Sequence, residues 1–254
     1  MSELTSDQLF DYLLRLGDDA LIAAQRLGEW YASSPEMEED VALANLALDQ
    51  LGAARALLTY AGEVEGAGRD EDALAYLRAD REFRNCLLVE LPNENFAVTI
   101  AKLLFLSAYQ LPLYDALVSS SDARLAEIAA KARKESAYHL DHAARWTLRL
   151  GDGTQESHRR MQAAVDAVWP YVHELLAADE TATRLASSGL AADPAELRAA
   201  WLSTVEPLLA EATLDRPADG WAPEGGRVGR HTEHLSYLLG EMQVLHRAHP
   251  GARW

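Results

Sequence analysis

The stretch DARLAEIAAKARKESAYHLDHAARWTLRLGDG, residues 122–153, decides the fold. Its apolar positions recur at alternating spacings of three and four, which marks one face of a long helix that meets a partner helix. The Ser119 to Asp122 cluster supplies a cap, and Gly151-Asp152-Gly153 supplies an end. The predicted face holds Leu125, Ile128, Ala132, Glu135, His139, His142 and Trp146. The helix therefore carries three polar groups on an otherwise apolar stripe.

Start and stop signals predict further helices on both sides of this one. Thr5 with Gln8 forms a capping box for the first helix. The first expected helix runs to about Tyr31, and the second runs from Ser34-Pro35 toward Gly62, followed by short turns between Asp70 and Arg84. The next runs from after Asn95 through Leu111 and is interrupted at Pro112. The later ones run from Thr154 to about Ala177 with a bend near Pro170, from Asp193 to about Ala212, and from Thr232 to Ala248. No alternation typical of strands persists. We predict an all-α protein, a mostly antiparallel four-helix bundle with additional helices, forming one domain over residues 1–254.

Composition and charge exclude several classes of function. The chain has 254 residues, with 23 Lys and Arg against 40 Asp and Glu, which gives a net charge of −17. That acidity argues against a protein that binds nucleic acid or anionic lipid, because both need a positive field. Cys86 stands alone, which excludes an internal disulfide and a Cys-based metal site. With no signal peptide pattern and no apolar run near ~18 residues, we expect a cytoplasmic protein without a membrane span.

Carboxylates fall on the apolar faces of several predicted helices. Asp49 shares a face with Leu46 and Ala53, and Glu29 lies one turn after Gln25. Buried carboxylates are costly unless a metal, a cation or hydrogen-bond donors compensate them. In a four-helix bundle the known arrangement is a dinuclear metal site, with one Glu from each of two helices and a Glu-x-x-His pair from each of the other two.

The sequence departs from that ligand rule at several points. Gly52 and Tyr138 stand where imidazoles should follow Asp49 and Glu135. The third long helix has no acid between Glu94 and Asp115, and Lys102 is its one charge in that stretch. Two carboxylates without a correctly spaced histidine do not hold two irons in the usual geometry.

Other polar residues leave two interpretations open. His139 and His142 either bind a metal together with Glu135 or are core histidines bonded to neighbouring acids. His231 and His234 either cap the last helix or bind a metal. Arg227 and Arg230 either meet a phosphate at that helix start or pair with carboxylates.

Five segments carry a resemblance to a known family. They are RLGDDALIAAQRLGEW (15–30), ALANLALDQLGAAR (42–55), LVELPNENFAVTIAK (88–102), KESAYHLDHAARW (134–146) and HTEHLSYLLGEMQVLHR (231–247). From about Leu13 to Trp254 the chain resembles the C subunits of bacterial phenylacetyl-CoA epoxidases, also called ring-1,2-phenylacetyl-CoA monooxygenases. The resemblance implies a ferritin-like fold and a multicomponent oxygenase. In it, a reductase passes electrons from NADPH, a homologous A subunit holds the di-iron site, and the C subunit is its structural, non-catalytic partner.

The resemblance also implies what the retained acids are. Glu29, Asp49 and Glu135 occupy positions similar to ligand positions of the catalytic relatives, whereas Gly52, Val98 and Tyr138 depart from them. The hypothesis is a vestigial site whose acids are held by hydrogen bonds or by Lys102. Its candidate residues are Glu29, Asp49, Glu135 and Tyr138. This chain then has no catalytic residue and binds no metal or cofactor itself, and di-iron belongs to the partner.

Two rival functions stand beside this one. A metal-dependent oxidase could use an unusual ligand set of Glu29, Asp49, Glu135, His139 and His142. A module that binds CoA thioesters is disfavoured because CoA is polyanionic and the chain is acidic without clustered Lys or Arg. A homodimer in the absence of the partner is a further expectation.

Overall fold

The computed structural model describes residues 6–252, and every regular element in that range is helical. The all-α prediction is therefore confirmed. Thr5 of the predicted capping box lies outside the described residues. The chain divides into two compact units, one made of Met1–Pro92 with Glu224–Trp254 and the other of Asn93–Pro223. A single domain over residues 1–254 stays a prediction.

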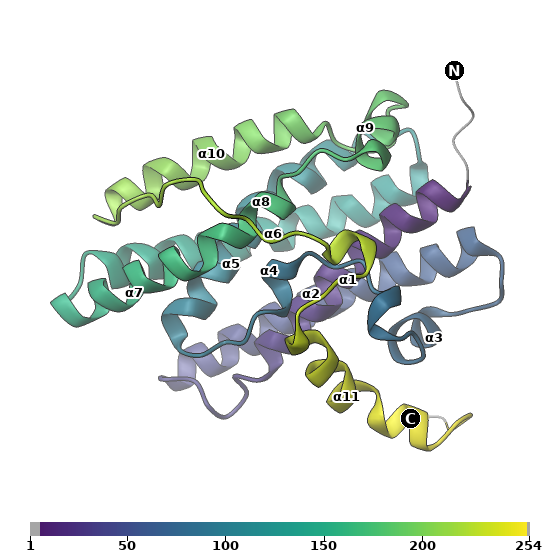
Figure 1. Ribbon diagram of the computed structural model, residues 1–254, viewed down its shortest axis with the longest axis horizontal. Helices are drawn as coiled ribbons and strands as arrows, with labels where there is room; N and C mark the ends of the chain where they lie inside the picture. The colour runs from purple at the N-terminus through teal and green to yellow at the C-terminus, as the bar shows by residue number, and fades with distance from the viewer. Residues whose placement is uncertain (1–5, 253–254) are drawn as a thin grey trace. The chain divides into compact units, whose positions relative to one another are not determined.

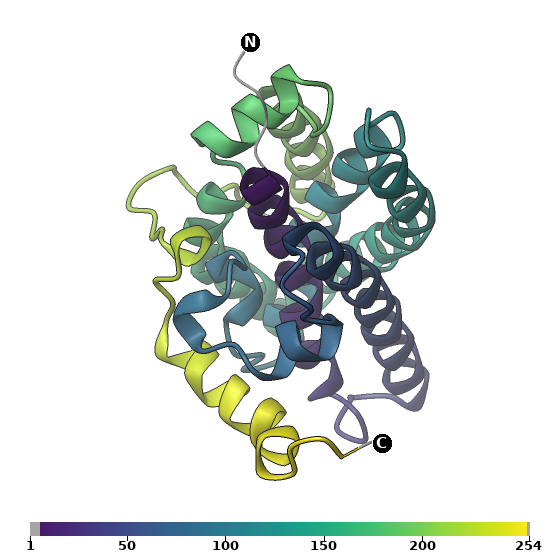
Figure 2. The ribbon, with the colours of Figure 1, turned by 90° about the vertical axis from the view of Figure 1, so that its right-hand side faces the viewer.

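The first unit is built on a helical hairpin. Helix α1 (Ser6–Gly28) packs along the length of α2 (Met37–Glu65), as Figure 1 and Figure 2 show. The remaining elements of this unit are α3 (Glu71–Tyr76), η1 (Asp80–Glu82), α4 (Leu87–Glu90), η3 (Gly226–Val228) and α11 (Glu233–Ala248). Helix α11 comes from the far end of the sequence and packs on α3 and η1. Segments from both ends of the chain thus form one core.

The second unit is built on another hairpin, α5 (Phe96–Leu117) with α6 (Ala123–Gly151). Helices α7 (Gln155–Val168) and α10 (Pro194–Glu211) cover α5, and η2 (Trp169–Tyr171), α8 (Val172–Leu175) and α9 (Glu180–Ser187) complete the unit. The rings of Phe105, Trp169 and Trp201 lie with each pair of centroids 5.6 Å apart. The Trp201 indole donates a hydrogen bond of 2.9 Å to the Phe105 carbonyl. Aromatic packing therefore joins α5, η2 and α10.

Capping residues explain most helix starts. The Asp122 side chain accepts from the Leu125 N–H at 2.9 Å, and Asp193 accepts from the Ala195 N–H at 2.8 Å, both as predicted. Ser34 does not cap α2, because its hydroxyl donates to the Trp30 carbonyl and the helix begins at Met37. The first helix ends at Gly28 rather than Tyr31, and Pro112 lies inside α5 without interrupting it.

The buried stripe of α6 differs from the predicted one. Leu125, Ala132 and His139 are buried as expected. The residues predicted between and after them, Ile128, Glu135, His142 and Trp146, are only partly buried. The buried positions in between are instead Ala129, Ser136, Ala143 and Thr147. A shift of one residue turns a helix by about 100°, so the predicted face was correct in alternate layers and wrong in the rest.

Helices α2 and α5 are both long and apolar enough to cross a membrane, by length and composition alone. In α5, 78% of the most apolar stretch is buried inside the protein, which is typical of a core helix. In α2 the corresponding share is 33%. The outer side of α2 is therefore unusually apolar for an exposed surface.

Candidate functional site

Two of the predicted vestigial residues lie in the first unit. Glu29 follows the end of α1, is exposed, and forms an ion pair with Arg26. Asp49 is half-buried on α2, and the fully packed position beside it is Gln50. Since the helix ends before Glu29, this carboxylate is not on the helix face where the sequence pattern places it.

The other two lie on α6 in the second unit. The Glu135 side chain is 19% exposed and pairs with Lys131 at 3.4 Å, one turn earlier on the same helix. Tyr138 is 53% exposed, and His139 next to it is buried. Lys102 on α5 is buried and donates to the Asn93 Oδ1 at 3.0 Å. Lys131 is thus a cationic partner of Glu135, and Lys102 has Asn93 as a partner. A role of Lys102 in holding the retained acids stays a prediction.

The donors present do not fit a di-iron centre in either unit. Across residues 6–252, no group of three or more His, Cys, Asp and Glu side chains is placed to hold a metal ion. Helix α5 has no carboxylate between Phe96 and Tyr114, whereas a bundle site takes a carboxylate from each of its four helices. The absence of a bound metal stays a prediction that needs direct measurement.

The first unit instead contains a polar cluster that the sequence did not reveal. It consists of Asp18, Asp19, Arg78, Glu90, Arg227 and His231. Asp18 and Arg78 are almost wholly buried, and both terminal guanidinium nitrogens of Arg78 donate to the Asp18 carboxylate. Asp18 also accepts from the Arg84 N–H at 2.8 Å, and the Arg78 guanidinium lies 4.2 Å from the centroid of the Phe83 ring. Each charge therefore has compensation, as a buried pair requires.

A second pair ties the C-terminal segment to α1. Arg227 donates to both carboxylate oxygens of Asp19, at 2.9 and 2.7 Å, and Asp19 accepts from the Cys86 N–H at 2.7 Å. Burial raises the pKa of Asp19, and the Arg227 charge and the Cys86 N–H oppose that rise. Arg227 thus pairs with a carboxylate, which is one of the two interpretations that the sequence left open.

A third pair fixes the start of α11. Glu90 accepts from His231 Nδ1 at 2.8 Å, from the Thr232 N–H at 2.6 Å and from Asn85 at 3.0 Å. The other His231 nitrogen, Nε2, lies 3.1 Å from the Phe83 carbonyl, which can only accept. A protonated imidazole satisfies both contacts, because both of its ring nitrogens donate. Burial lowers the pKa of His231, but the hydrogen bond and charge of Glu90 outweigh burial and leave the pKa raised.

Glycines let the C-terminal loop approach closely enough for these pairs to form. A Cβ on Gly226 would lie 2.2 Å from the Asn85 carbonyl oxygen. A Cβ on Gly229 would lie 2.1 Å from the Arg81 carbonyl oxygen, and Gly229 has a φ of 76°. The Gly-rich loop before α11 is thus shaped by contact with residues 81–86.

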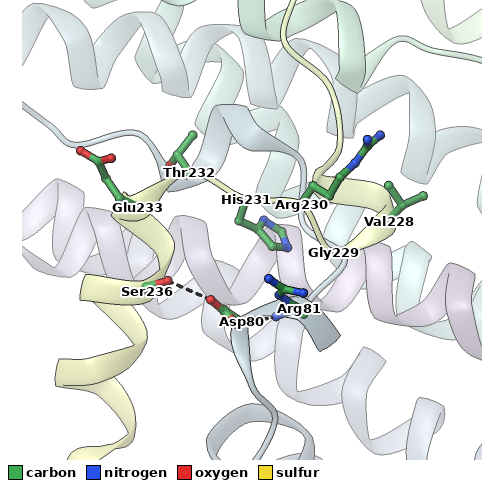
Figure 3. A pocket seen from close by; sticks show the side chains of 9 residues that line it. All are labelled: Asp80, Arg81, Val228, Gly229, Arg230, His231, Thr232, Glu233 and Ser236. Carbon is green, nitrogen blue, oxygen red and sulfur yellow. Dashed lines mark hydrogen bonds between the residues drawn. The ribbon is translucent and has the colours of Figure 1, made fainter.

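An open pocket of about 560 Å³ adjoins the cluster. Its lining is Asp80, Arg81, Val228, Gly229, Arg230, His231, Thr232, Glu233 and Ser236 (Figure 3). The Ser236 hydroxyl donates to Asp80 at 3.0 Å. His231 has both nitrogens engaged, so it cannot act as a base toward the pocket. The interpretation of His231 as a helix cap is wrong, because its nitrogens contact Glu90 and Phe83. The arrangement anchors residues 226–234 rather than supplying acid–base chemistry.

Comparison with known proteins assigns the chain to a family. The family described as phenylacetic acid catabolic protein matches residues 1–254, and the chain belongs to it. Among its relatives is the C subunit of 1,2-phenylacetyl-CoA epoxidase from Escherichia coli (strain K12), which is 49% identical over 248 residues. That alignment covers 98% of this chain and 100% of the relative. The resemblance drawn from the five sequence segments is confirmed.

Proposed function

We propose that the chain is the structural, non-catalytic subunit of a multicomponent phenylacetyl-CoA epoxidase that takes part in aerobic phenylacetate breakdown in the cytoplasm. The observation that carries the proposal is the 49% identity to the C subunit of such an epoxidase, over 98% of this chain and 100% of the relative. A similarity that extends along both chains favours the same role in the same kind of complex.

The chemistry of the side chains supports a role without catalysis. Glu29 and Glu135 are held by Arg26 and Lys131, and Tyr138 is largely exposed. In the first unit the buried carboxylates of the polar cluster are engaged by arginine, histidine and backbone N–H donors. These carboxylates have cationic or hydrogen-bonding partners within the protein, and this supports a role in the fold.

The proposed partner is a homologous catalytic A subunit that holds the di-iron site. A protein without its own metal contributes by shaping, stabilising or positioning its partner through a broad surface. Two helical hairpins with buried cores provide such rigid surfaces. Without the partner, we propose that the chain forms a homodimer.

Metal analysis tests the non-catalytic role. The chain, expressed with ample iron, is purified and its iron content measured, and oxygen uptake is followed after reconstitution with ferrous iron. We expect iron far below one equivalent and no oxygen uptake above that of free iron. Near-stoichiometric iron with oxygen uptake would instead support the rival metal-dependent oxidase.

Copurification tests the role in a complex. A tagged catalytic A subunit is co-expressed with the untagged chain and the eluate is analysed by light scattering. We expect a stable complex of defined mass. Elution of the tagged protein alone, with the chain folded in the flow-through, would contradict the proposal.

A further inference from the structure

We propose that the outer face of α2 is the surface through which this chain docks to its partner subunit, by packing against an apolar helix flanked by basic residues. The inference rests on the proposed function and deepens it. The surface, called the outer stripe below, consists of Met37, Val41, Ala44, Leu48 and Leu51.

The outer stripe is exposed to an extent unusual for large apolar side chains. Met37 is 81% exposed, Val41 59% and Leu48 64%, and Leu51 is 40% exposed. The opposite side of α2 is buried through Leu43, Leu46, Leu57 and other residues. The first unit therefore builds its core without the outer stripe, and a contiguous apolar patch left outside a core marks an interaction surface.

The spacing of the stripe specifies the kind of occupant. The residues follow one another at intervals of four, three, four and three. That repeat keeps the side chains on a single seam, which another α-helix can fill along its length at a shallow crossing angle. From Met37 to Leu51 the seam runs about 21 Å at 1.5 Å per residue, or roughly four turns.

A groove continues the stripe at its C-terminal end. It has a volume of about 310 Å³ and is lined by Leu51, Leu58 and Tyr76 together with residues of α1 and α3. A space of this size, open at one side, accepts a large side chain of a docked helix. Apolar anchors that fill such pockets contribute most of the binding energy of protein interfaces.

Charge selects a basic partner. Glu36 and Glu38 are exposed at the N-terminal end of the stripe, and Glu71 and Asp72 line the groove at the other end. Arg55 also lines the groove and is bonded to Glu71 at 3.1 Å. A second copy docked through the same stripe would bring these acids close to one another, whereas Lys and Arg beside an apolar helix would complement both ends. Anionic lipid is repelled for the same reason.

Helix α11 offers a contrast that serves as a control. Its exposed apolar residues are Tyr237, Val244 and Leu245, and Glu241 interrupts them. A seam with a carboxylate in its centre fits an apolar helix poorly. Position 244 is thus exposed and helical like position 48 but lies outside the outer stripe.

Thiol protection in the assembled complex tests the surface. Cys86 is fully buried, so a cysteine introduced at Leu48→Cys is the reactive thiol of the described chain. The rate of alkylation by a maleimide is measured for the chain alone and for the complex with the co-expressed catalytic partner. We expect strong protection of position 48 in the complex and no protection in the control Val244→Cys. In addition, Leu48→Glu should lower affinity about 30-fold or more, while circular dichroism of the variant stays unchanged.

The outcomes separate this inference from the proposed function. A stable complex in which position 48 reacts as fast as in the free chain, or in which only position 244 is protected, overturns the inference and leaves the role in the complex intact. Failure of the wild-type chain to form any complex overturns both. Protection in the chain alone that grows with concentration assigns the stripe to a second copy. Binding to phosphatidylserine–phosphatidylcholine vesicles that Leu48→Glu abolishes assigns it to membranes, and either result contradicts a partner helix.

Discussion

The first unit is held together around buried charges, and the second around aromatic rings. In the first, three acid–base pairs join α1, residues 78–90 and the C-terminal segment. In the second, Phe105, Trp169 and Trp201 pack at centroid distances of 5.6 Å. Buried ion pairs specify one arrangement because a misplaced charge has no partner, whereas ring packing stabilises through area and tolerates small shifts. The two units should therefore respond differently to substitution and to pH.

The largest effect is expected from Asp18→Asn. This substitution leaves the Arg78 guanidinium buried without its counter-ion, so we expect the free energy of unfolding to fall by about 3–5 kcal/mol. Urea denaturation followed by circular dichroism measures the change. Asp11→Asn on the same helix is the matched control, since Asp11 forms partly exposed pairs with Arg15 and Arg84 and should lose at most about 1 kcal/mol. Equal losses in the two variants would mean that the buried pair is not a special source of stability.

Trp201→Phe tests the aromatic unit and should have the next largest effect. It removes the hydrogen bond to the Phe105 carbonyl and part of a wholly buried ring, which should cost about 2–3 kcal/mol. Thermal unfolding followed by calorimetry measures this loss of stability. Trp221→Phe is the control, because Trp221 is 75% exposed and should change stability by less than about 0.5 kcal/mol. A loss in Trp201→Phe no greater than in its control would show that the rings do not hold the second unit.

Gly229→Ala tests whether close backbone approach positions the charged pairs. The added Cβ meets the Arg81 carbonyl oxygen at a positive φ, and we expect a loss of about 2 kcal/mol. Gly68→Ala has a similar φ of 78° but no atom within 4 Å of the new Cβ, so it isolates the cost of the backbone angle at about 1 kcal/mol. Identical losses in a urea titration would assign the effect to φ alone.

The smallest effect on stability is expected from a change of pH, through the titration of His231. The pKa of His231 is raised in the folded protein above its ordinary value of 6.5. Its contribution to stability is therefore complete below that value and is lost as pH rises through the folded pKa. Unfolding midpoints in urea should fall between neutral and mildly alkaline pH in the wild type and fall less in His231→Gln. Parallel profiles for the two proteins would contradict a charged imidazole beside Glu90.

Much of the helical architecture was predictable because its signals are local. Asn95, Asp122 and Asp193 cap helices within three residues of themselves, and their side-chain chemistry suffices to place those starts. Ser34 failed as a cap because Ser-Pro-Glu also suits a turn, and the hydroxyl bonds backwards to Trp30 instead. The predicted stripe of α6 agrees with the buried one at Leu125, Ala132 and His139. Spacings of three then four and of four then three both add up to seven, so the two patterns coincide at every second position.

The polar cluster was not predictable, because its partners are distant in sequence. Arg78 lies 60 residues from Asp18, and Arg227 lies 208 residues from Asp19. Adjacent acids in RLGDDALIAA resemble a solvated patch on an otherwise apolar helix. The one available signal was that Leu16 to Ala24 leaves no polar face for them, so both carboxylates had to be buried and compensated.

The discontinuity of the first unit has a consequence for how the protein is made. A ribosome that has delivered residues 1–223 has completed the contiguous second unit, but Asp19 still lacks its guanidinium and Glu90 its imidazole. In residues 6–92, the carboxylates of Asp19 and Glu90 stay without these partners until Arg227 and His231 have been synthesised. Early termination before Arg227 would therefore leave a product that chaperones and proteases recognise as unfinished.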